Sequence, residues 1–442
     1  MNASANNARS KLLRSSGQLL LAGLVLLAAA VVWDNWGDLL TSPTASPTAS
    51  APATPDTLQR GHYLVQAGNC IACHSERGRP QLAGGRAIDT PFGPVYSSNL
   101  TPDPDTGLGR WSAQDFWQAL HHGRSRGGRL LAPAFPYEHT SVITREDSDA
   151  MFAWLHSQSP VQQAQPPHGL TWPLGTQAAF AVWRSLFFKP SPFVPDAHQS
   201  AEWNRGAYLV QGLGHCAACH SPRNALGATA GVSDLSGGLM PVVNWYAPDL
   251  TNDRETGLAS TPLAEVVQLL RTGTNGQAQT SGPMSEVVQH SLQHLSQADV
   301  QAMAVYLQSR AQATRTATPT SAAMPPRIPA TVAERGLKVY DRHCVTCHGE
   351  QGQGAPGIYP ALAGNRAVLL GEPTNLVQAL LYGGYGPATA GHPRPFGMPP
   401  FVLELDDRDI AAVLTHIRSQ WGNHAGEVTP LQVNRIRAAS AQ

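Results

Sequence analysis

The chain has 442 residues, enough for about three domains of ordinary size. Its 30 basic and 30 acidic residues balance, which excludes the strongly basic surface that nucleic acids select. Charged residues make up 14% of the sequence, against roughly 25% in an average soluble protein, which suggests a surface partly covered by partners or membrane.

The N-terminus carries an export signal. Arg9, Lys11 and Arg14 precede an unbroken apolar run of 15 residues, 19–33. This length is at the top of the range for the apolar region of a signal peptide and short of the roughly 20 residues that a spanning helix prefers. Because the positive flank stays in the cytoplasm, everything downstream is exported. We interpret residues 1–40 as a signal peptide or membrane anchor and expect a retained single-pass anchor, with a cleaved signal peptide as the alternative.

Two tracts rich in Pro, Ser, Thr and Ala divide the rest of the chain. Residues 41–57 contain the direct repeat SPTAS and form a semi-extended linker, and residues 311–329 form a second linker. Around them the sequence repeats itself. The expected pieces are a first unit 58–160, an inter-domain aromatic segment 161–199, a second unit 200–310, a third unit 330–425 and a C-terminal tail 426–442.

Each unit opens with an Arg-Gly pair inside a short helix pattern and continues with a CxxCH motif, 9, 10 and 8 residues after the glycine. The pairs are Arg60-Gly61, Arg205-Gly206 and Arg335-Gly336. The motifs are Cys70, Cys73 and His74; Cys216, Cys219 and His220; and Cys344, Cys347 and His348.

The six cysteines all lie in these motifs, so none is left for a disulfide. A lone CxxC reads as half a zinc site or a redox dithiol. The histidine that follows it three times favours c-type haem attachment instead, with thioether bonds from both cysteines and iron ligation by the histidine. We therefore expect three covalently bound haem c groups.

Each unit closes with an amphipathic helix whose start has a capping signal. The cap residues and the acids three positions later are Thr144 with Asp147, Ser296 with Asp299, and Asp406 with Asp409.

A helix with a glycine, a CxxCH motif, a methionine loop and a closing helix resembles a class I cytochrome c domain. The tandem resembles the cytochrome c subunit of membrane-bound periplasmic dehydrogenases of the alcohol, gluconate, sorbitol and fructose type. The more specific marks are Pro91-Phe92-Gly93 with Ser98-Asn99-Leu100-Thr101-Pro102-Asp103, Tyr359-Pro360-Ala361-Leu362-Ala363-Gly364, and Trp421-Gly422-Asn423-His424-Ala425.

This resemblance implies an all-α fold of three tandem class I cytochrome c domains, in which the first and last helices of each domain cross at the glycine. It implies an electron-transfer subunit on the periplasmic side of the bacterial inner membrane, not an enzyme in itself. The partner would be a catalytic subunit of the flavin, pyrroloquinoline quinone (PQQ) or molybdopterin type, and the acceptor would be ubiquinone or a terminal oxidase.

A haem with His/Met ligation needs a thioether on its distal side. Met284, 64 residues after His220, and Met398, 50 residues after His348, lie in Pro/Gly loops just before the closing helices. Both are expected distal ligands. In the first unit the position at which the resembling family commonly has methionine holds Phe135, whose phenyl ring cannot ligate iron.

Several outcomes stay open for the first iron. His139, or His121 or His122, could supply a second imidazole. Otherwise the iron stays five-coordinate beneath Phe135, or another residue such as Met151 ligates it.

The sequence contains no dinucleotide glycine motif, metal-hydrolase motif or nucleophile elbow, so we expect electron transfer to be the function. Two alternatives belong to other classes. One is a stand-alone membrane-tethered relay, and the other is a haem enzyme or ligand binder that uses the first haem. The apolar segment 169–193 packs between units or forms a patch for a catalytic subunit or the membrane.

Overall fold

The computed structural model describes residues 2–41, 53–240, 242–276, 278–315 and 328–440. The described residues form mostly helices, with three short two-stranded antiparallel ladders. Most of the first predicted linker and of the second (42–52 and 316–327) lies outside the described residues.

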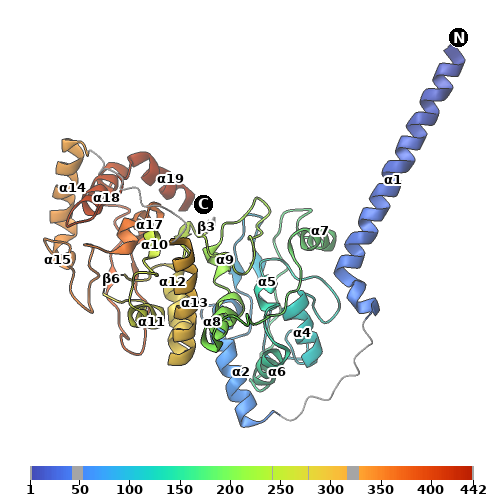
Figure 1. Ribbon diagram of the computed structural model, residues 1–442, viewed down its shortest axis with the longest axis horizontal. Helices are drawn as coiled ribbons and strands as arrows, with labels where there is room; N and C mark the ends of the chain where they lie inside the picture. Colours follow the sequence, from blue (N-terminus) through green and yellow to red (C-terminus); the bar gives the residue numbers. More distant parts are fainter. Residues whose placement is uncertain (1, 42–52, 241, 277, 316–327, 441–442) are drawn as a thin grey trace.

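Helix α1 (Asn2–Thr41) projects away from the rest of the molecule (Figure 1). Its stretch Gln18–Gly37 has a mean hydropathy of 1.9 and is long and apolar enough to cross a membrane. By length and composition it is a signal sequence or an anchor.

The first unit begins with the helix that precedes its CxxCH motif and ends with the capped helix. Its elements are α2 (Pro55–Ala67), α3 (Cys70–His74), β1 (Ala87–Ile88), β2 (Val95–Tyr96), α4 (Ala113–His122), α5 (Tyr137–Thr140) and α6 (Arg145–His156). Helix α7 (Gln177–Phe187) lies in the segment that leads to the second unit.

The second unit repeats this order with additional short helices. Its elements are α8 (Ala201–Gln211), α9 (Ala217–His220), β3 (Gly238–Met240), β4 (Trp245–Ala247), α10 (Asp253–Thr256), α11 (Leu263–Thr272), α12 (Pro283–His290), the 3-10 turn η1 (Leu292–His294) and α13 (Gln297–Arg315).

The third unit carries an extra helix at its end. Its elements are α14 (Ala330–His343), α15 (Val345–His348), α16 (Arg366–Leu369), α17 (Thr374–Tyr382), β5 (Gly384–Tyr385), β6 (Gly397–Met398), α18 (Asp407–Ser419) and α19 (Pro430–Ser440). The predicted tail is therefore partly helical, and Val433 and Ile436 of α19 are buried in the core of the third unit.

The opening and closing helices of each unit cross at the predicted glycine. A Cβ atom at Gly61 would lie 2.0 Å from the carbonyl oxygen of Ala150. The same distance is 1.9 Å from Gly206 to Ala302 and 2.3 Å from Gly336 to Ala412. No real Cβ atom approaches an oxygen so closely, so only glycine allows the three pairs α2/α6, α8/α13 and α14/α18 to pack.

An ion pair accompanies each crossing. The arginine before the glycine reaches the acid of the closing helix's first turn in all three units. The N···O distances are 2.6 Å for Arg60–Asp147, 2.8 Å for Arg205–Asp299 and 3.0 Å for Arg335–Asp409. The predicted caps are also present, since Thr144, Ser296 and Asp406 accept bonds from the backbone N–H of these three acids.

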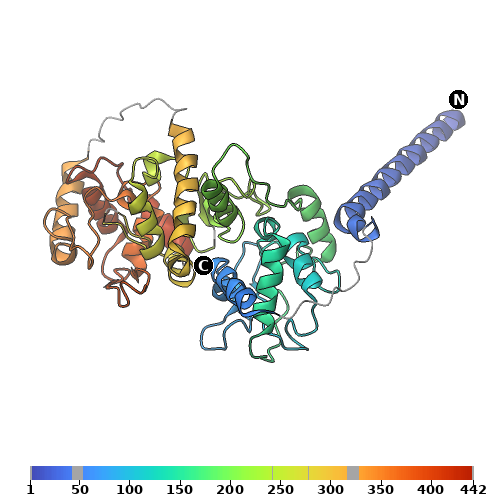
Figure 2. The same cartoon turned by 60° about the horizontal axis from the view of Figure 1, so that its bottom comes forward.

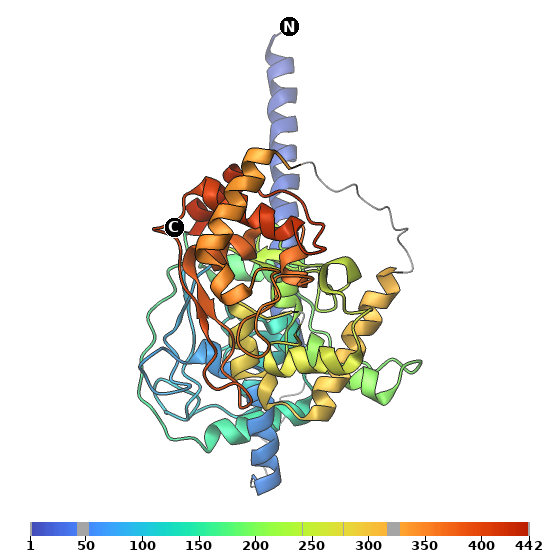
Figure 3. The same cartoon turned by 90° about the vertical axis from the view of Figure 1, so that its left-hand side faces the viewer.

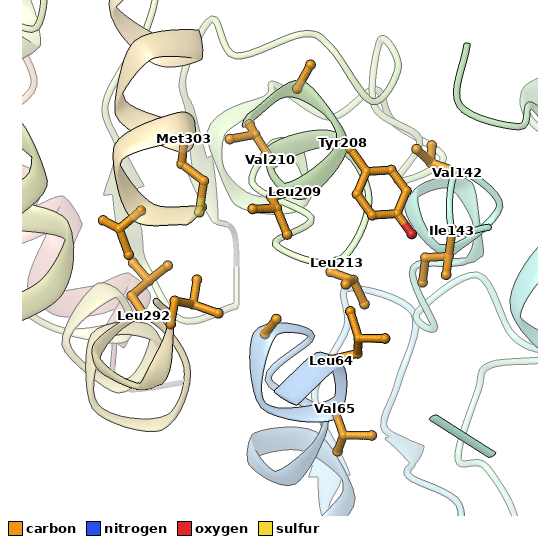
Figure 4. Close-up of a cluster of buried hydrophobic side chains, with 14 of the residues drawn as sticks. Leu64, Val65, Val142, Ile143, Tyr208, Leu209, Val210, Leu213, Leu292 and Met303 are labelled. Atoms are coloured by element: carbon orange, nitrogen blue, oxygen red, sulfur yellow. The ribbon is translucent and has the colours of Figure 1, made fainter. Parts of the chain in front are cut away.

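The first and second units share one hydrophobic core. Figure 4 shows Leu64 of α2, Ile143 before α6, Leu209 of α8, Leu213 and Met303 of α13 converging on it. All five are at most 2% exposed.

Two reciprocal hydrogen bonds close the seam between the first and second units. Tyr63 of the first unit donates to Asp299 of the second, and Tyr208 of the second donates to Asp147 of the first, each over 2.6 Å. Each tyrosine therefore meets the acid of the other unit's ion pair, as in a pseudo-twofold dimer.

The third unit has a separate core and meets the second through polar contacts. Asn244 donates to the carbonyl oxygen of Ile436 over 2.9 Å, and Gln378 donates to the carbonyl oxygen of Asn244 over 2.8 Å. Asn375 donates to the carbonyl oxygen of Tyr246 over 2.7 Å. Figure 3 views the molecule from the side of the third unit.

Candidate haem sites

Each CxxCH motif forms a short turn of helix directly after the opening helix of its unit. In the first two units a residue with a positive φ angle separates the two, Asn69 at 49° and His215 at 37°. In α3 and its counterparts the two cysteines stand three positions apart, so their side chains lie on one face of the turn. This arrangement allows both cysteine side chains to form covalent bonds to the same planar group.

The motif histidines have the same hydrogen bond in all three units. The Nδ1 atom donates to a backbone carbonyl: of Ser98 for His74 (2.7 Å), of Pro248 for His220 (2.8 Å) and of Pro360 for His348 (3.0 Å). Because a carbonyl oxygen only accepts, the proton sits on Nδ1 and the lone pair on Nε2. Each ring is thus held in the tautomer that ligates a metal through Nε2.

Burial lowers the pKa of His74, His220 and His348, although the carbonyl at Nδ1 acts in the opposite direction. A metal ligand must be a neutral imidazole. The surroundings therefore keep all three rings in the ligating state at neutral pH.

The cysteines are free of disulfides. Burial raises the pKa of Cys70, Cys216 and Cys344 to about 12, so these side chains are neutral thiols at neutral pH. Within the described residues, no three His, Cys, Asp or Glu side chains gather as they would around a zinc ion. Two thiols and one neutral imidazole at each site fit covalent haem attachment.

Met284 and Met398 lie at the edges of two cores. Met284 is the second residue of α12 and is partly buried against the core that the first two units share. Met398 is in β6, paired with Gly384, and is partly buried against the core of the third unit. Both side chains are therefore partly exposed.

Phe135 is partly buried against the same core as Met284. His139, four residues later, is 2% exposed and donates from Nδ1 to the carbonyl oxygen of Gln211 in α8 over 2.9 Å. Its counterpart four residues after Met284 is Val288, which is fully buried in the core. His139 thus lies at a packing position of the fold, on the seam with the second unit.

The other residues considered for the first iron lie elsewhere. Met151 of α6 is 2% exposed within the hydrophobic core. His121 of α4 is 8% exposed and stacks on Trp117, with 4.3 Å between the ring centres, and His122 contacts it edge-on at 4.8 Å. These side chains take part in packing within the first unit.

The structure also places the first two sites next to each other, which the sequence did not predict. Helix α12, which carries Met284, contacts α3, which carries the first CxxCH motif. Arg86 of the first unit lies 3.8 Å from Glu286 of α12. The tyrosines of the reciprocal bonds, Tyr63 and Tyr208, stand at the same offset from Arg60 and Arg205, but nothing near them in the sequence indicates their partners.

The cytochrome c family model matches residues 333–421. The chain is 37% identical over 407 residues to the alcohol dehydrogenase (quinone), cytochrome c subunit, of Gluconacetobacter polyoxogenes, covering 88% of this chain and 86% of that protein. It is 37% identical over 396 residues to the gluconate 2-dehydrogenase cytochrome c subunit of Pantoea cypripedii, with 86% and 89% covered. It is 34% identical over 427 residues to the fructose dehydrogenase cytochrome subunit of Gluconobacter japonicus, with 91% and 87% covered.

Proposed function

Because the chain belongs to the family of cytochrome c subunits of dehydrogenases, we propose that it is a three-haem electron carrier built from three class I cytochrome c domains. The family establishes a c-type cytochrome that transfers electrons and is not the catalytic subunit. We propose in addition the number of haems, the residues that ligate them and the electron acceptor.

The observation that carries the proposal is the threefold repetition of one site. Two cysteines on one turn, a histidine held by a carbonyl at Nδ1, and a glycine crossing recur in all three units. A haem attached to such a site supplies a one-electron couple. The attachment residues are Cys70, Cys73, Cys216, Cys219, Cys344 and Cys347, and the proximal iron ligands are His74, His220 and His348.

The distal sides differ. Met284 and Met398 serve as thioether ligands of the second and third irons, which favours the ferrous state. In the first unit Phe135 takes the place of the methionine, and the first iron keeps His74 as its only protein ligand. The burial of His139, at a position that matches the core residue Val288, supports this choice over a second imidazole.

The chain receives electrons from a catalytic subunit of the flavin, PQQ or molybdopterin type and passes them singly to ubiquinone or a terminal oxidase. The relatives named as subunits of dehydrogenases support such a partner. Helix α1 retains the chain on the periplasmic side of the inner membrane.

Mass spectrometry of the purified protein, together with the pyridine haemochrome spectrum, tests the haem count. We expect three haems per chain, and two in the variant C70A/C73A. Two or fewer haems in the unmodified protein would refute the proposal.

Purification from the native membrane in mild detergent tests the partner. A dehydrogenase catalytic subunit should accompany the chain. Its absence from an intact, haem-loaded preparation would favour the stand-alone relay instead.

A further inference from the structure

The C-terminal end of α1 packs against the first unit and the helix α7 that follows it. The Asn35 side chain is 1% exposed, and its Nδ2 atom donates to the carbonyl oxygen of Ala181 and to the hydroxyl of Ser185, both over 3.0 Å. Its Oδ1 atom accepts from Nε of Arg184 over 2.8 Å. These partners all belong to α7, which lies beside the base of α1 in Figures 1 and 2.

The contact continues on both sides of Asn35. Trp36 donates from its indole nitrogen to the carbonyl oxygen of Gly128 over 3.2 Å. Val31 and Trp36 also pack on a small core that contains Phe180 and Ala181 of α7. Because a buried amide is costly unless all its bonds are made, this contact fixes α1 to α7 in one orientation.

Helix α1 contains the stretch Gln18–Gly37, which is long and apolar enough to cross a bilayer and which runs into this contact at its C-terminal end. The membrane surface would therefore lie where α1 enters the first unit, beside α7.

Helix α7 and the loop before it expose apolar side chains at this place. Val182 is 48% and Leu186 is 64% exposed, and with a spacing of four they share a face of α7 beside the Asn35 contacts. Trp172 in the preceding loop is 83% exposed. Exposed tryptophan and aliphatic side chains close to a spanning helix in the chain are typical of a membrane interface.

The charges of the segment agree with this surface. Residues 169–195 contain no Asp or Glu, and their only cations are Arg184 and Lys189. Arg184 is 4% exposed, held between Asn35 and the rings of Tyr137 and Phe188. This segment therefore exposes apolar side chains and the positive charge of Lys189 and has no acidic side chain, so an anionic lipid surface would attract it rather than repel it.

We propose that Asn35 locks α1 to α7 and thereby holds the exposed face of α7, with Trp172, in the lipid headgroup region of the membrane that α1 crosses. The first unit is then the one nearest the bilayer, in a fixed orientation. This inference rests on the proposed anchoring by α1 and is independent of the haem ligands.

Photo-crosslinking of the full, haem-loaded chain in nanodiscs of phosphatidylethanolamine and phosphatidylglycerol tests the proposal. The variant Leu186→p-benzoylphenylalanine should form lipid adducts that mass spectrometry detects. The control is Leu403→p-benzoylphenylalanine, because Leu403 is 96% exposed and belongs to the third unit. The helices of that unit lie on the opposite side of the molecule from α1 (Figure 1). It should form none.

The substitution Asn35→Ala tests the lock. It should reduce the lipid adduct at position 186 to the level of the Leu403 control, while the haem content stays unchanged. An unchanged adduct would overturn the role of Asn35. Adducts to protein alone, or no adducts, at position 186 would overturn the membrane surface. Release of the unmodified chain by alkaline carbonate would overturn the anchoring itself and leave the electron-transfer proposal standing.

Discussion

The seam between the first and second units differs in kind from the seam between the second and third. The first two units share one hydrophobic core and exchange two tyrosine–aspartate hydrogen bonds. The third unit keeps its own core and meets the second through amides such as Asn244 and Gln378. Lys338 stands in the third unit where Tyr63 and Tyr208 stand in the others.

The difference teaches that three copies of one pattern need not make three equivalent modules. An apolar seam cannot open without exposing its core to water, whereas a polar seam exchanges its bonds for bonds to water at a smaller net cost. We therefore expect the first two units to unfold as one body and the third to unfold separately.

The largest effect should follow from a cavity in the shared core. Leu213 is 2% exposed, and Leu213→Ala should cost about 2–5 kcal/mol and lower the unfolding temperature of the first two units together. The matched variant in the other core is Leu381→Ala, which should affect the third unit alone. Differential scanning calorimetry measures both, and a single transition that shifts equally in the two variants would contradict the division.

Exchange of distal residues should shift the reduction potentials. Met398→Ala removes the thioether, so the third haem's potential should fall by an amount on the order of 0.1 V, within the range of about 0.8 V that axial ligands span. Phe135→Met should raise the potential of the first haem by a similar amount. Spectroelectrochemical titration measures these changes. If Phe135→Met leaves all three potentials in place, another residue already ligates the first iron.

A smaller effect is expected at the polar seam. Gln378 donates from Nε2 to the carbonyl oxygen of Asn244 and to the hydroxyl of Ser440 over 2.7 Å. Gln378→Ala removes both bonds and takes this donor from the buried carbonyl oxygen of Asn244, while Ser440 keeps its bonds to Asn244 and Ile436, so the change should cost about 1–3 kcal/mol. Calorimetry should show the loss in the third unit's transition only, and a shift of the other transition would mean that the polar seam is coupled to the shared core.

The smallest effect concerns pH. Burial acts to raise the pKa of Asp299, but the bonds from Arg205 and Tyr63 outweigh it and hold that pKa below its usual value. A carboxyl whose pKa is lower in the folded state than in the unfolded state stabilises the fold fully at pH values above its unfolded-state pKa, which is about 4. This contribution disappears as the pH falls through the folded-state pKa. The unfolding temperature of the first two units should therefore fall below about pH 4. In calorimetric scans across pH, Asp299→Asn should make this unfolding temperature less dependent on pH.

Much of the fold was predictable because it depends on local signals. The caps at Thr144, Ser296 and Asp406 follow from short-range rules, and the structure confirms them. The close approach at the three glycines was implied by the resemblance to class I cytochrome c domains, and the structure confirms it too. The cytochrome c character and the electron-transfer role followed from the CxxCH motifs, and the relatives confirm both.

The seams were not predictable because they join residues that are far apart in the chain. Tyr63 and Asp299 are separated by 236 positions, and no local pattern pairs them. The same holds for Asn35 and Arg184, and for the burial of Val433 and Ile436 in a segment expected to be a tail. Short ladders such as β1/β2 were missed because two residues carry no periodic signal.

The distal ligand of the first iron is the point at which the three sites differ most. Titration of the fully reduced protein with carbon monoxide, followed by its absorption spectrum, tests it most directly. One carbon monoxide per chain, bound rapidly while two haems stay unchanged, is the predicted result. No binding would show that the first iron has a second protein ligand and would contradict the assignment of Phe135.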